Sequence, residues 1–183
     1  QWQSNDPAVI MQELVESAHV TAARSRAIYV PEQPAFIRGH GASFDLIGTD
    51  ESVWTDFVLE ARVQFLVQDQ DVGCGLFYRW QDERNLDMAY IDTQGGFGLV
   101  QARDAQLTVN TYDLSPMVLP EQMNRLLVLA QGDQVALYIN GALVAQETVQ
   151  PGSGRAGAAL LNYSDLRADC YLSNIWAWQI ESE

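Results

Sequence analysis

The chain contains no lysine. Its ten basic residues are all arginine and stand against 24 acidic residues, so the formal net charge is −14 over 183 residues. A field of that sign repels phosphate backbones and anionic lipid headgroups, which argues against nucleic acid and membrane surfaces as partners. An acidic surface favours solubility, and the other interpretation is a surface that attracts cations.

Long apolar runs are also absent, and none approaches the roughly 18 residues that a transmembrane helix needs. We therefore expect no membrane insertion in this chain. The start, Gln1 to Pro7, has no Met, no basic segment and no apolar segment of a signal peptide, which predicts a mature or trimmed chain. Charged residues are few, at 19%, and hydrophobic residues make up 48%, so the composition is that of one globular domain with a full core.

Histidine and cysteine are scarce, with two of each. His19 and His40 have no metal-ligand or catalytic partner at a recognisable spacing, so a histidine-based mechanism has little support. Cys74 and Cys170 both lie in strand-like runs. They are either two core thiols or, in a secreted sandwich, a disulfide, which would contribute on the order of 4 kcal/mol by closing a long loop. The sequence leaves both readings open.

The strongest local pattern runs from residue 124 to residue 149, where two turn signals separate three apolar runs. Gly132-Asp133 and Asn140-Gly141 are these signals. Both central residues of a type I′ turn need a positive φ, which Asn tolerates and Gly accepts freely. The pattern predicts a three-stranded meander, with Val135, Leu137 and Ile139 on one face.

Other segments have the length and turn chemistry of strands. Residues 57–65 alternate most regularly and predict a half-buried strand, with Glu60 on its polar, solvated face. Residues 107–123, with Pro116 and Pro120, are expected to be a long connection. Strands at spacings of about 8 to 12 residues are typical of a sandwich or a barrel. The further strands that we expect are 35–37, 43–47, 73–80, 86–92, 96–103, 155–162 and 168–180.

Residues 6–27 have helical periodicity instead, after an N-cap at Asp6 and Pro7 at the first helical position. The helix either packs over the sandwich or is an arm that docks on another subunit, which would make residues 6–27 a self-association element. Trp176 and Trp178 share a face of the last strand and are expected to pack under this helix or against a neighbour. We divide the chain into a helical segment, 1–34, and a β-sandwich, 35–183.

Five pieces of the sequence, between Phe44 and Ile180, resemble the concanavalin A-like, or laminin G-like, jelly roll. Among families of that fold, the chain looks closest to bacterial extracellular domains related to the 3-keto-disaccharide hydrolase family, which share the Gly-Leu-x-x-Arg and Asn-Gly pieces. The five pieces are Trp54 to Glu60, Gly75 to Arg79 followed by Asp82 to Asn85, Asn124 to Gly141, Gly154 to Gly157, and Leu172 to Ile175.

The resemblance implies an all-β, two-sheet antiparallel jelly-roll sandwich with a short N-terminal helix, located outside the cell or at its surface. The glucanases of family 16 carry catalytic carboxylates as Glu-x-Asp-x-x-Glu on one strand, and that motif is absent here. Glu60 has Arg62 and Gln64 on its face in place of a second carboxylate. This favours a module that does not catalyse a reaction.

A sugar site needs an aromatic face and a few planar polar groups, which the concave sheet of this fold would supply. If residues 73–80 alternate regularly, Arg79 shares a face with Phe77, close to Trp80 and Asp82. Asp87 on the next strand is a further candidate. The predicted carbohydrate-binding residues are Arg79, Trp80, Asp82, Asp87, Asn162 and Tyr163.

Calcium is a more plausible cofactor than zinc, because oxygen ligands are frequent in the loops of this chain. Asp69 and Asp71 form the best pair, with Asp165 and Asp169 as another. No Asp-x-Asp-x-Asp-Gly loop is present, so solvated loop acids are the default interpretation and calcium is the alternative.

Three functions remain open. The first is a carbohydrate-binding module. The second is a structural domain of a bacterial surface protein that binds another protein through the helix and the edge of the sandwich. The third is a glycoside hydrolase that acts on disaccharides, with acids that the spacing does not identify.

Overall fold

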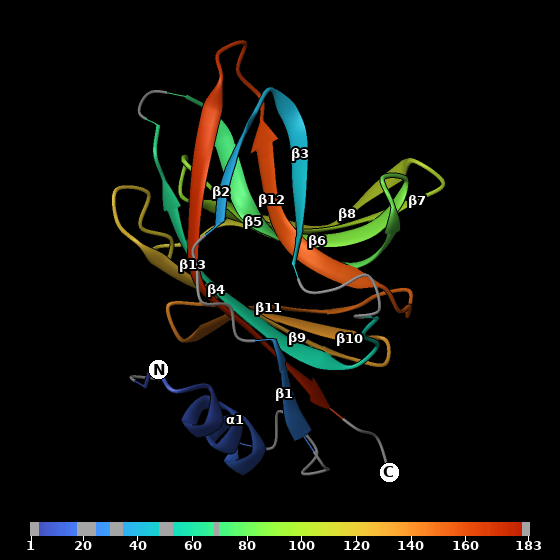
Figure 1. The fold of residues 1–183 in the computed structure, drawn as a ribbon. Coiled ribbons are helices and arrows are strands. Elements are labelled where there is room, and N and C mark those ends of the chain that lie inside the picture. Colours follow the sequence, from blue (N-terminus) through green and yellow to red (C-terminus); the bar gives the residue numbers. More distant parts are fainter. Residues whose placement is uncertain (1–3, 18–24, 30–34, 48–52, 68–69, 181–183) are drawn as a thin grey trace.

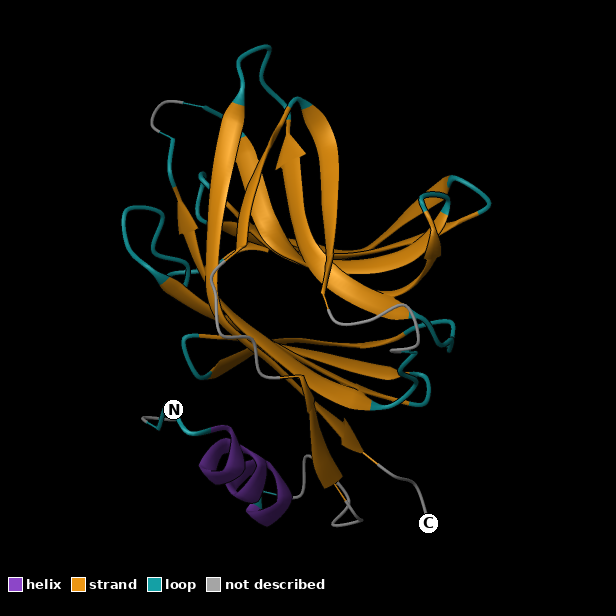
Figure 2. Ribbon diagram, viewed as in Figure 1, coloured by secondary structure: helices purple, strands orange, loops and turns teal. Residues whose placement is uncertain are grey.

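The computed structural model describes residues 4–17, 25–29, 35–47, 53–67 and 70–180. These residues form one helix and thirteen strands (Figures 1 and 2). The elements are α1 (Pro7–Glu16), β1 (Ser25–Tyr29), β2 (Ala35–Gly39), β3 (Gly41–Ile47), β4 (Phe57–Phe65), β5 (Val72–Asp82), β6 (Asn85–Asp92), β7 (Gly96–Arg103), β8 (Gln106–Leu114), β9 (Asn124–Gln131), β10 (Gln134–Ile139), β11 (Ala142–Thr148), β12 (Arg155–Asn162) and β13 (Ala168–Ile180).

The strands form two antiparallel sheets packed face to face. Sheet A has seven strands in the order β1-β13-β4-β9-β10-β11, with β2 also paired to β13. Sheet B has six strands in the order β3-β12-β5-β6-β7-β8. The two layers are visible in Figure 1, where β5 to β8 of sheet B lie above β9 to β11 of sheet A. The expected all-β jelly-roll sandwich with a short N-terminal helix is confirmed.

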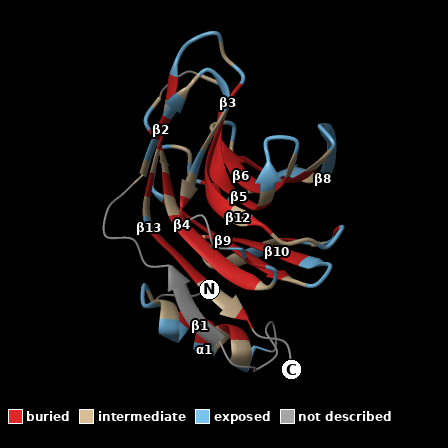
Figure 3. Ribbon diagram, turned by 45° about the vertical axis from the view of Figure 1, so that its right-hand side comes forward, coloured by how far each residue is buried: buried red, intermediate tan, exposed pale blue. Residues whose placement is uncertain are grey.

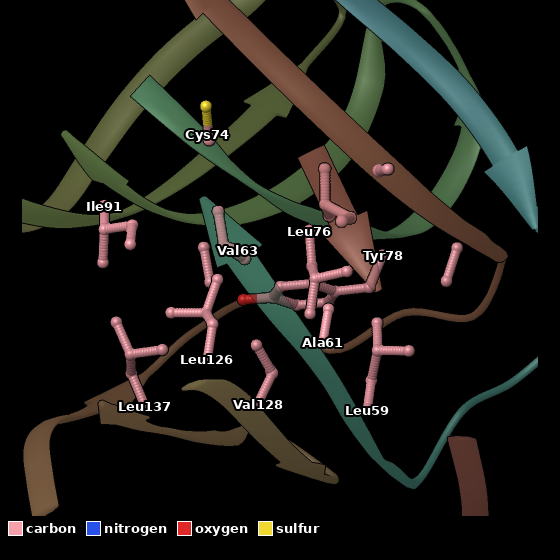
Figure 4. Close-up of a cluster of buried hydrophobic side chains, with 14 of the residues drawn as sticks. Leu59, Ala61, Val63, Cys74, Leu76, Tyr78, Ile91, Leu126, Val128 and Leu137 are labelled. Atoms are coloured by element: carbon pink, nitrogen blue, oxygen red, sulfur yellow. The ribbon is translucent and has the colours of Figure 1, made fainter. Parts of the chain in front are cut away.

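The core between the sheets is built by alternation along each strand. Figure 4 shows Leu59 and Val63 of β4 meeting Leu76 of β5, together with side chains of β6, β9 and β10. Cys74 on sheet B and Cys170 on sheet A lie in this core, 5.9 Å apart between their Cα atoms, and form a disulfide. The bridge that the sequence left open therefore ties one sheet to the other.

The meander is confirmed as β9, β10 and β11. Asn140 has φ 51° and Gly141 has φ 82°, as the Asn-Gly turn requires. The Asn140 side chain adds a tertiary role, because its Oδ1 accepts from the backbone nitrogen of Arg125 and its Nδ2 donates to the carbonyl of Met117.

The N-terminal helix is shorter than expected. The Asp6 side chain accepts from the backbone nitrogen of Ala8, and α1 ends at Glu16. Residues 25–27, the end of the segment that we expected to be helical, instead belong to β1, which pairs with β13. The helix prediction was wrong there because pairing with a distant strand outweighs a weak local preference for helix. His19 lies outside the described residues. No helix in the described part of the chain is long and apolar enough to cross a membrane.

The outer face of sheet A is covered by α1. Ile10 and Leu14 of the helix are fully buried against this face, which includes Trp176, and Trp178 packs at its margin. The prediction that these tryptophans pack under the helix is confirmed. Because α1 buries its apolar face within the chain, that face offers little for self-association through residues 6–27.

This cover also changes the environment of β4, which is buried on both faces rather than half-buried. Glu60 is 2% exposed, so its expected position on a solvated face was wrong. Its Oε2 accepts from Nε of Arg125 at 2.8 Å, and Nη1 of Arg125 donates to the carbonyl of Ser4. Burial raises the pKa of Glu60 above its ordinary range, with Arg125 opposing the rise.

The expected connection 107–123 contains an unexpected strand. Residues 106–114 form β8, which pairs with β7 and is the edge strand of sheet B among the described residues. Its alternation is interrupted at Asn110, where Leu99 pairs with Thr111 and Val100 with Val109. Because of this bulge, the alternation typical of a strand cannot be recognised in the sequence of β8.

The disulfide yields a prediction about stability. Replacing Cys74 and Cys170 together by alanine should lower the free energy of unfolding by about 4 kcal/mol, because the 96-residue separation is constrained in the oxidised unfolded chain. Urea titration of the variant, and of the wild type in its oxidised and reduced forms, measures this loss of free energy of unfolding. A double variant as stable as the oxidised wild type would contradict the structural role of the bridge.

Glu60 yields a prediction about pH. Since its pKa is raised in the folded state, its contribution to stability is full below the unfolded pKa of about 4.3 and is lost as pH rises through the folded pKa. Glu60→Gln removes this loss. The free energy of unfolding of E60Q relative to wild type should therefore increase from mildly acidic to neutral pH. Chemical denaturation measures both free energies. A difference between E60Q and wild type that stays constant or falls as pH rises would contradict the prediction.

Candidate functional site

Sheet B presents a concave outer face. In Figure 1, β7 and β8 rise on one side of this face, and β3 and β12 rise on the other. Strand register identifies its members, because directly opposed residues point to the same side. The concave face, as we use the term, consists of Phe44, Leu46, Gly73, Gly75, Phe77, Trp80, Leu86, Met88, Tyr90, Asp92, Gly96, Gly98, Val100, Ala102, Leu107, Val109, Tyr112, Leu114, Arg155, Gly157, Ala159 and Leu161.

Tyr90 lies at the centre of this face, between glycines. It is opposed by Gly75 on β5 and by Gly98 on β7. A Cβ at Gly98 would lie 2.5 Å from Cε1 of Tyr90, and one at Gly73 would lie 3.0 Å from Cδ2. The ring therefore occupies space that side chains on both neighbouring strands would fill, and glycine is required there for it to lie along the sheet.

Three tyrosines and two aspartates gather at one end of the concave face. We call Tyr90, Tyr112, Tyr163, Asp71 and Asp92 the tyrosine–aspartate cluster. Asp92 anchors it: Oδ1 accepts from the backbone nitrogens of Gln94 and Gly96 at 2.9 and 2.7 Å, and Oδ2 accepts from the Tyr112 hydroxyl at 2.9 Å. The Tyr90 and Tyr163 hydroxyls lie close enough for each to affect the pKa of the other.

The cluster combines buried anchors with exposed rings. Asp92 is 4% exposed, whereas Tyr112 and Tyr163 are 51% and 60% exposed. The hydrogen bond to Asp92 raises the pKa of Tyr112, and burial raises the pKa of Tyr163 and of Tyr90. All three phenols stay protonated at neutral pH. The face thus offers aromatic rings to stack on and hydroxyls held in fixed directions.

The opposite end of the concave face carries Trp80, as expected. Its ring packs against Phe77, with centroids 6.2 Å apart, and the Arg155 guanidinium lies 5.7 Å from its centroid. Asp82 is close in sequence but has a local role. It accepts from the backbone nitrogen of Arg84 and from Nδ2 of Asn85, which closes the β5–β6 hairpin, and these hydrogen bonds lower its pKa.

Arg79 does not lie on the concave face, so its expected side of the strand was wrong. A bulge with φ 51° at Arg79 shifts the register between Tyr78 and Asp82. Arg79 consequently points between the sheets, is 2% exposed, and donates from Nη2 to the carbonyl of Gly132 at 2.6 Å. A Cβ at Gly154 would collide with the backbone of Arg79, so the strand beside the bulge needs glycine.

Asp87 and Asn162 are also part of the scaffold. Asp87 is 1% exposed and forms ion pairs with Arg103 and, at 3.7 Å, with Arg79. Burial raises its pKa against these partners. Asn162 is 6% exposed and donates to the carbonyls of Gly39 and Leu166, which holds the loop between β12 and β13. Neither side chain presents a polar group to the concave face.

The expected site residues therefore do not form one group. Trp80 is opposed by Arg155 at the start of β12, and Tyr163 directly follows the end of β12. Eight residues of strand separate these positions, which is about 26 Å. Whether any of the six expected residues binds a carbohydrate stays a prediction, with Tyr163 well placed by its exposure and Trp80 by its position on the concave face.

The expected calcium ligands are dispersed. Asp69 lies outside the described residues, and Asp71 is exposed beside the tyrosine–aspartate cluster. Asp169 forms an ion pair with Arg38, and Asp165 is exposed. In the described part of the chain, no three His, Cys, Asp or Glu side chains gather as a metal site would require. Calcium binding stays a prediction.

The sequence interpretation missed Tyr90, Tyr112 and Asp92. Asp92 carried a readable signal, because an aspartate before Thr93-Gln94-Gly95 is typical of a turn in which the carboxylate accepts backbone hydrogen bonds. Tyr112 was hidden by the interrupted alternation of β8. Tyr90 had no local signal, since its surroundings come from glycines on two other strands.

No family model matches the sequence, and no curated protein sequence matches it significantly. Among solved structures, the chain is similar to the carbohydrate-binding module CBM66 from Bacillus subtilis, with a TM-score of 0.67 and 18% identity, covering 82% of this chain and 92% of that one. It is similar to a Bacillus licheniformis β-glucanase with a TM-score of 0.55 and 10% identity, covering 72% and 69%. It also matches the GH43 protein BlXynB from Bacillus licheniformis, with a TM-score of 0.55 and 8% identity, covering 69% of this chain and 28% of that one. The fold is a concanavalin A-like jelly-roll sandwich.

Proposed function

We propose that this chain is a non-catalytic carbohydrate-binding module that works outside the cell or at its surface and binds sugar on the concave face of sheet B. The observation that carries the proposal is the pair of exposed rings on that face, Tyr112, whose hydroxyl is hydrogen-bonded to Asp92, and Tyr163, whose hydroxyl lies close to that of Tyr90. The similarity in fold to a carbohydrate-binding module over most of both chains supports it.

The chemistry of the face suits a neutral sugar. The apolar side of a pyranose stacks on an aromatic ring, while its hydroxyls require donors and acceptors in fixed directions. Tyr112 supplies a ring and a phenol oriented by Asp92, and Tyr163 supplies a ring beside the hydroxyl of Tyr90. Trp80 adds a third aromatic group at the far end of the face. A ligand of several sugar units would reach from one end toward the other.

Binding without hydrolysis is supported by the positions of the buried carboxylates. Glycoside hydrolysis uses two carboxyl groups on either side of the scissile bond, about 5 to 9.5 Å apart. Of the buried acids among the described residues, Glu60 lies under α1 on sheet A and Asp87 lies between the sheets. Asp92 is on the concave face, but both of its oxygens accept hydrogen bonds from the protein. None of these three buried acids is therefore free to act as a catalytic carboxylate, and hydrolysis of disaccharides is the second candidate.

A panel of neutral glucan, xylan, mannan and fructan oligosaccharides tests the proposal, screened with calcium and again with chelator. At least one class should bind, and Tyr163→Ala should weaken that binding about fivefold by removing a stacking surface worth roughly 1 kcal/mol. Isothermal titration calorimetry measures the change. A loss of binding in chelator would in addition support a role for Asp71.

Phe36→Ala is the matched control. Phe36 is 65% exposed, close to the 60% of Tyr163, but it lies on β2 of sheet A, away from the concave face. F36A should bind as wild type does. Binding that is equally strong in Y163A and wild type would refute the site, and silence across the whole panel would refute the function.

A further inference from the structure

The strand β8 is an exposed edge with an apolar side. Figure 3 shows it at the rim of sheet B, coloured mostly as exposed. Leu107, Val109, Tyr112 and Leu114 are between 51% and 64% exposed, and all four point to the concave side. Natural edge strands are usually protected by charges or by a covering segment, because their free backbone groups pair readily with another strand.

The bulge gives this apolar side an internal symmetry. Before Asn110 the concave positions are Leu107 and Val109, and after it they are Tyr112 and Leu114. Without the extra residue, the concave side would continue on odd-numbered positions. Because of the extra residue, the four concave positions are arranged symmetrically about the bond between Asn110 and Thr111.

We propose that β8 pairs antiparallel with β8 of a second copy of this chain, so that sheet B continues across a two-fold axis. The symmetric register places Leu107 opposite Leu114 of the second copy, and Val109 opposite Tyr112 of the second copy. Each copy thus sets its apolar side chains against apolar side chains of the other, as a two-fold interface requires. The register follows from the bulge, because an uninterrupted strand of this length would not oppose these four residues to one another.

The low charge of β8 makes this strand the part of the surface where two acidic copies repel each other least. The chain carries 24 acidic residues and a net charge of −14, so most surfaces of two copies repel each other. Eight of the nine residues of β8 are uncharged, and the exception is Asp113. In the proposed register, Asp113 lies opposite Thr108 of the second copy, on the other side of the sheet, so no carboxylate of β8 meets another.

This pairing is independent of the proposed sugar function, although it adjoins the same face. Edge-to-edge pairing joins the two sheets in one surface and leaves the concave side of each open. Two concave faces would then lie side by side in one particle, which would raise the apparent affinity for a polymer with repeated sites.

Sedimentation equilibrium of the wild type and three variants tests the proposal. Wild type should show a monomer–dimer equilibrium. Leu107→Glu places a carboxylate opposite Leu114 of the second copy at two symmetric positions, and it should weaken the dimer at least tenfold. The double variant L107E/L114K should restore it, because the carboxylate at position 107 of each copy then faces an ammonium group at position 114 of the other.

The control L107E/L166K adds the same lysine away from β8. Leu166 is 64% exposed, as Leu114 is, but lies in the loop after β12, so this variant should remain as weak as L107E. Circular dichroism verifies that each variant folds. A wild type that is monomeric at every concentration would overturn the proposal and leave β8 to a strand of a different protein. A dimer that survives L107E, or equal recovery by both double variants, would overturn it as well.

Discussion

The aromatic rings on the concave face of sheet B occupy space that is free only because neighbouring positions are glycine. A Cβ at Gly75 would lie 2.6 Å from Cα of Tyr90, and one at Gly157 would lie 2.5 Å from Cζ of Phe77. Any larger residue would force the strands apart or push the aromatic rings out of the face. The position of Tyr90 depends on this absence of side chains, and so does that of Tyr163, whose hydroxyl lies close to that of Tyr90.

The two sheets use their outer faces differently. On sheet A, α1 buries Val58, Leu127 and Trp176, and an ion pair between Glu60 and Arg125 fills the margin. On sheet B no element of the described chain covers the concave side in the same way, and its exposed tyrosines face outward. The disulfide joins the sheets through the core. The molecule therefore has one closed outer face, which supports the fold, and one open outer face, which is the natural place for a ligand.

Local rules predicted the fold well. Asn140-Gly141 and the turn at Gly95 dictate hairpins through backbone conformation alone, and regular alternation in residues 57–65 identifies β4. The same rules failed wherever a bulge or a distant segment intervenes. The bulge at Arg79 moved its side chain into the core, and the bulge at Asn110 hid β8. Glu60 was misplaced because its burial depends on α1, some fifty residues away in sequence.

The candidate site was harder to predict for a related physical reason. Trp80 and Tyr163 were recognisable as aromatics beside polar turns, but they lie at opposite ends of the face. The residues between them derive their environment from several strands at once. Tyr90 is defined by Gly73, Gly75 and Gly98, which come from its two neighbouring strands. Only the assembled sheet shows that these positions share one surface.

The measurement that tests this account most directly is a map of amide chemical shifts in the uniformly ¹⁵N-labelled chain, titrated with the oligosaccharide that binds best in the panel. The account predicts that the largest changes fall on β6, β7, β8 and the loop that contains Tyr163. Changes concentrated on α1 and the outer face of sheet A, with the concave face unaffected, would contradict it.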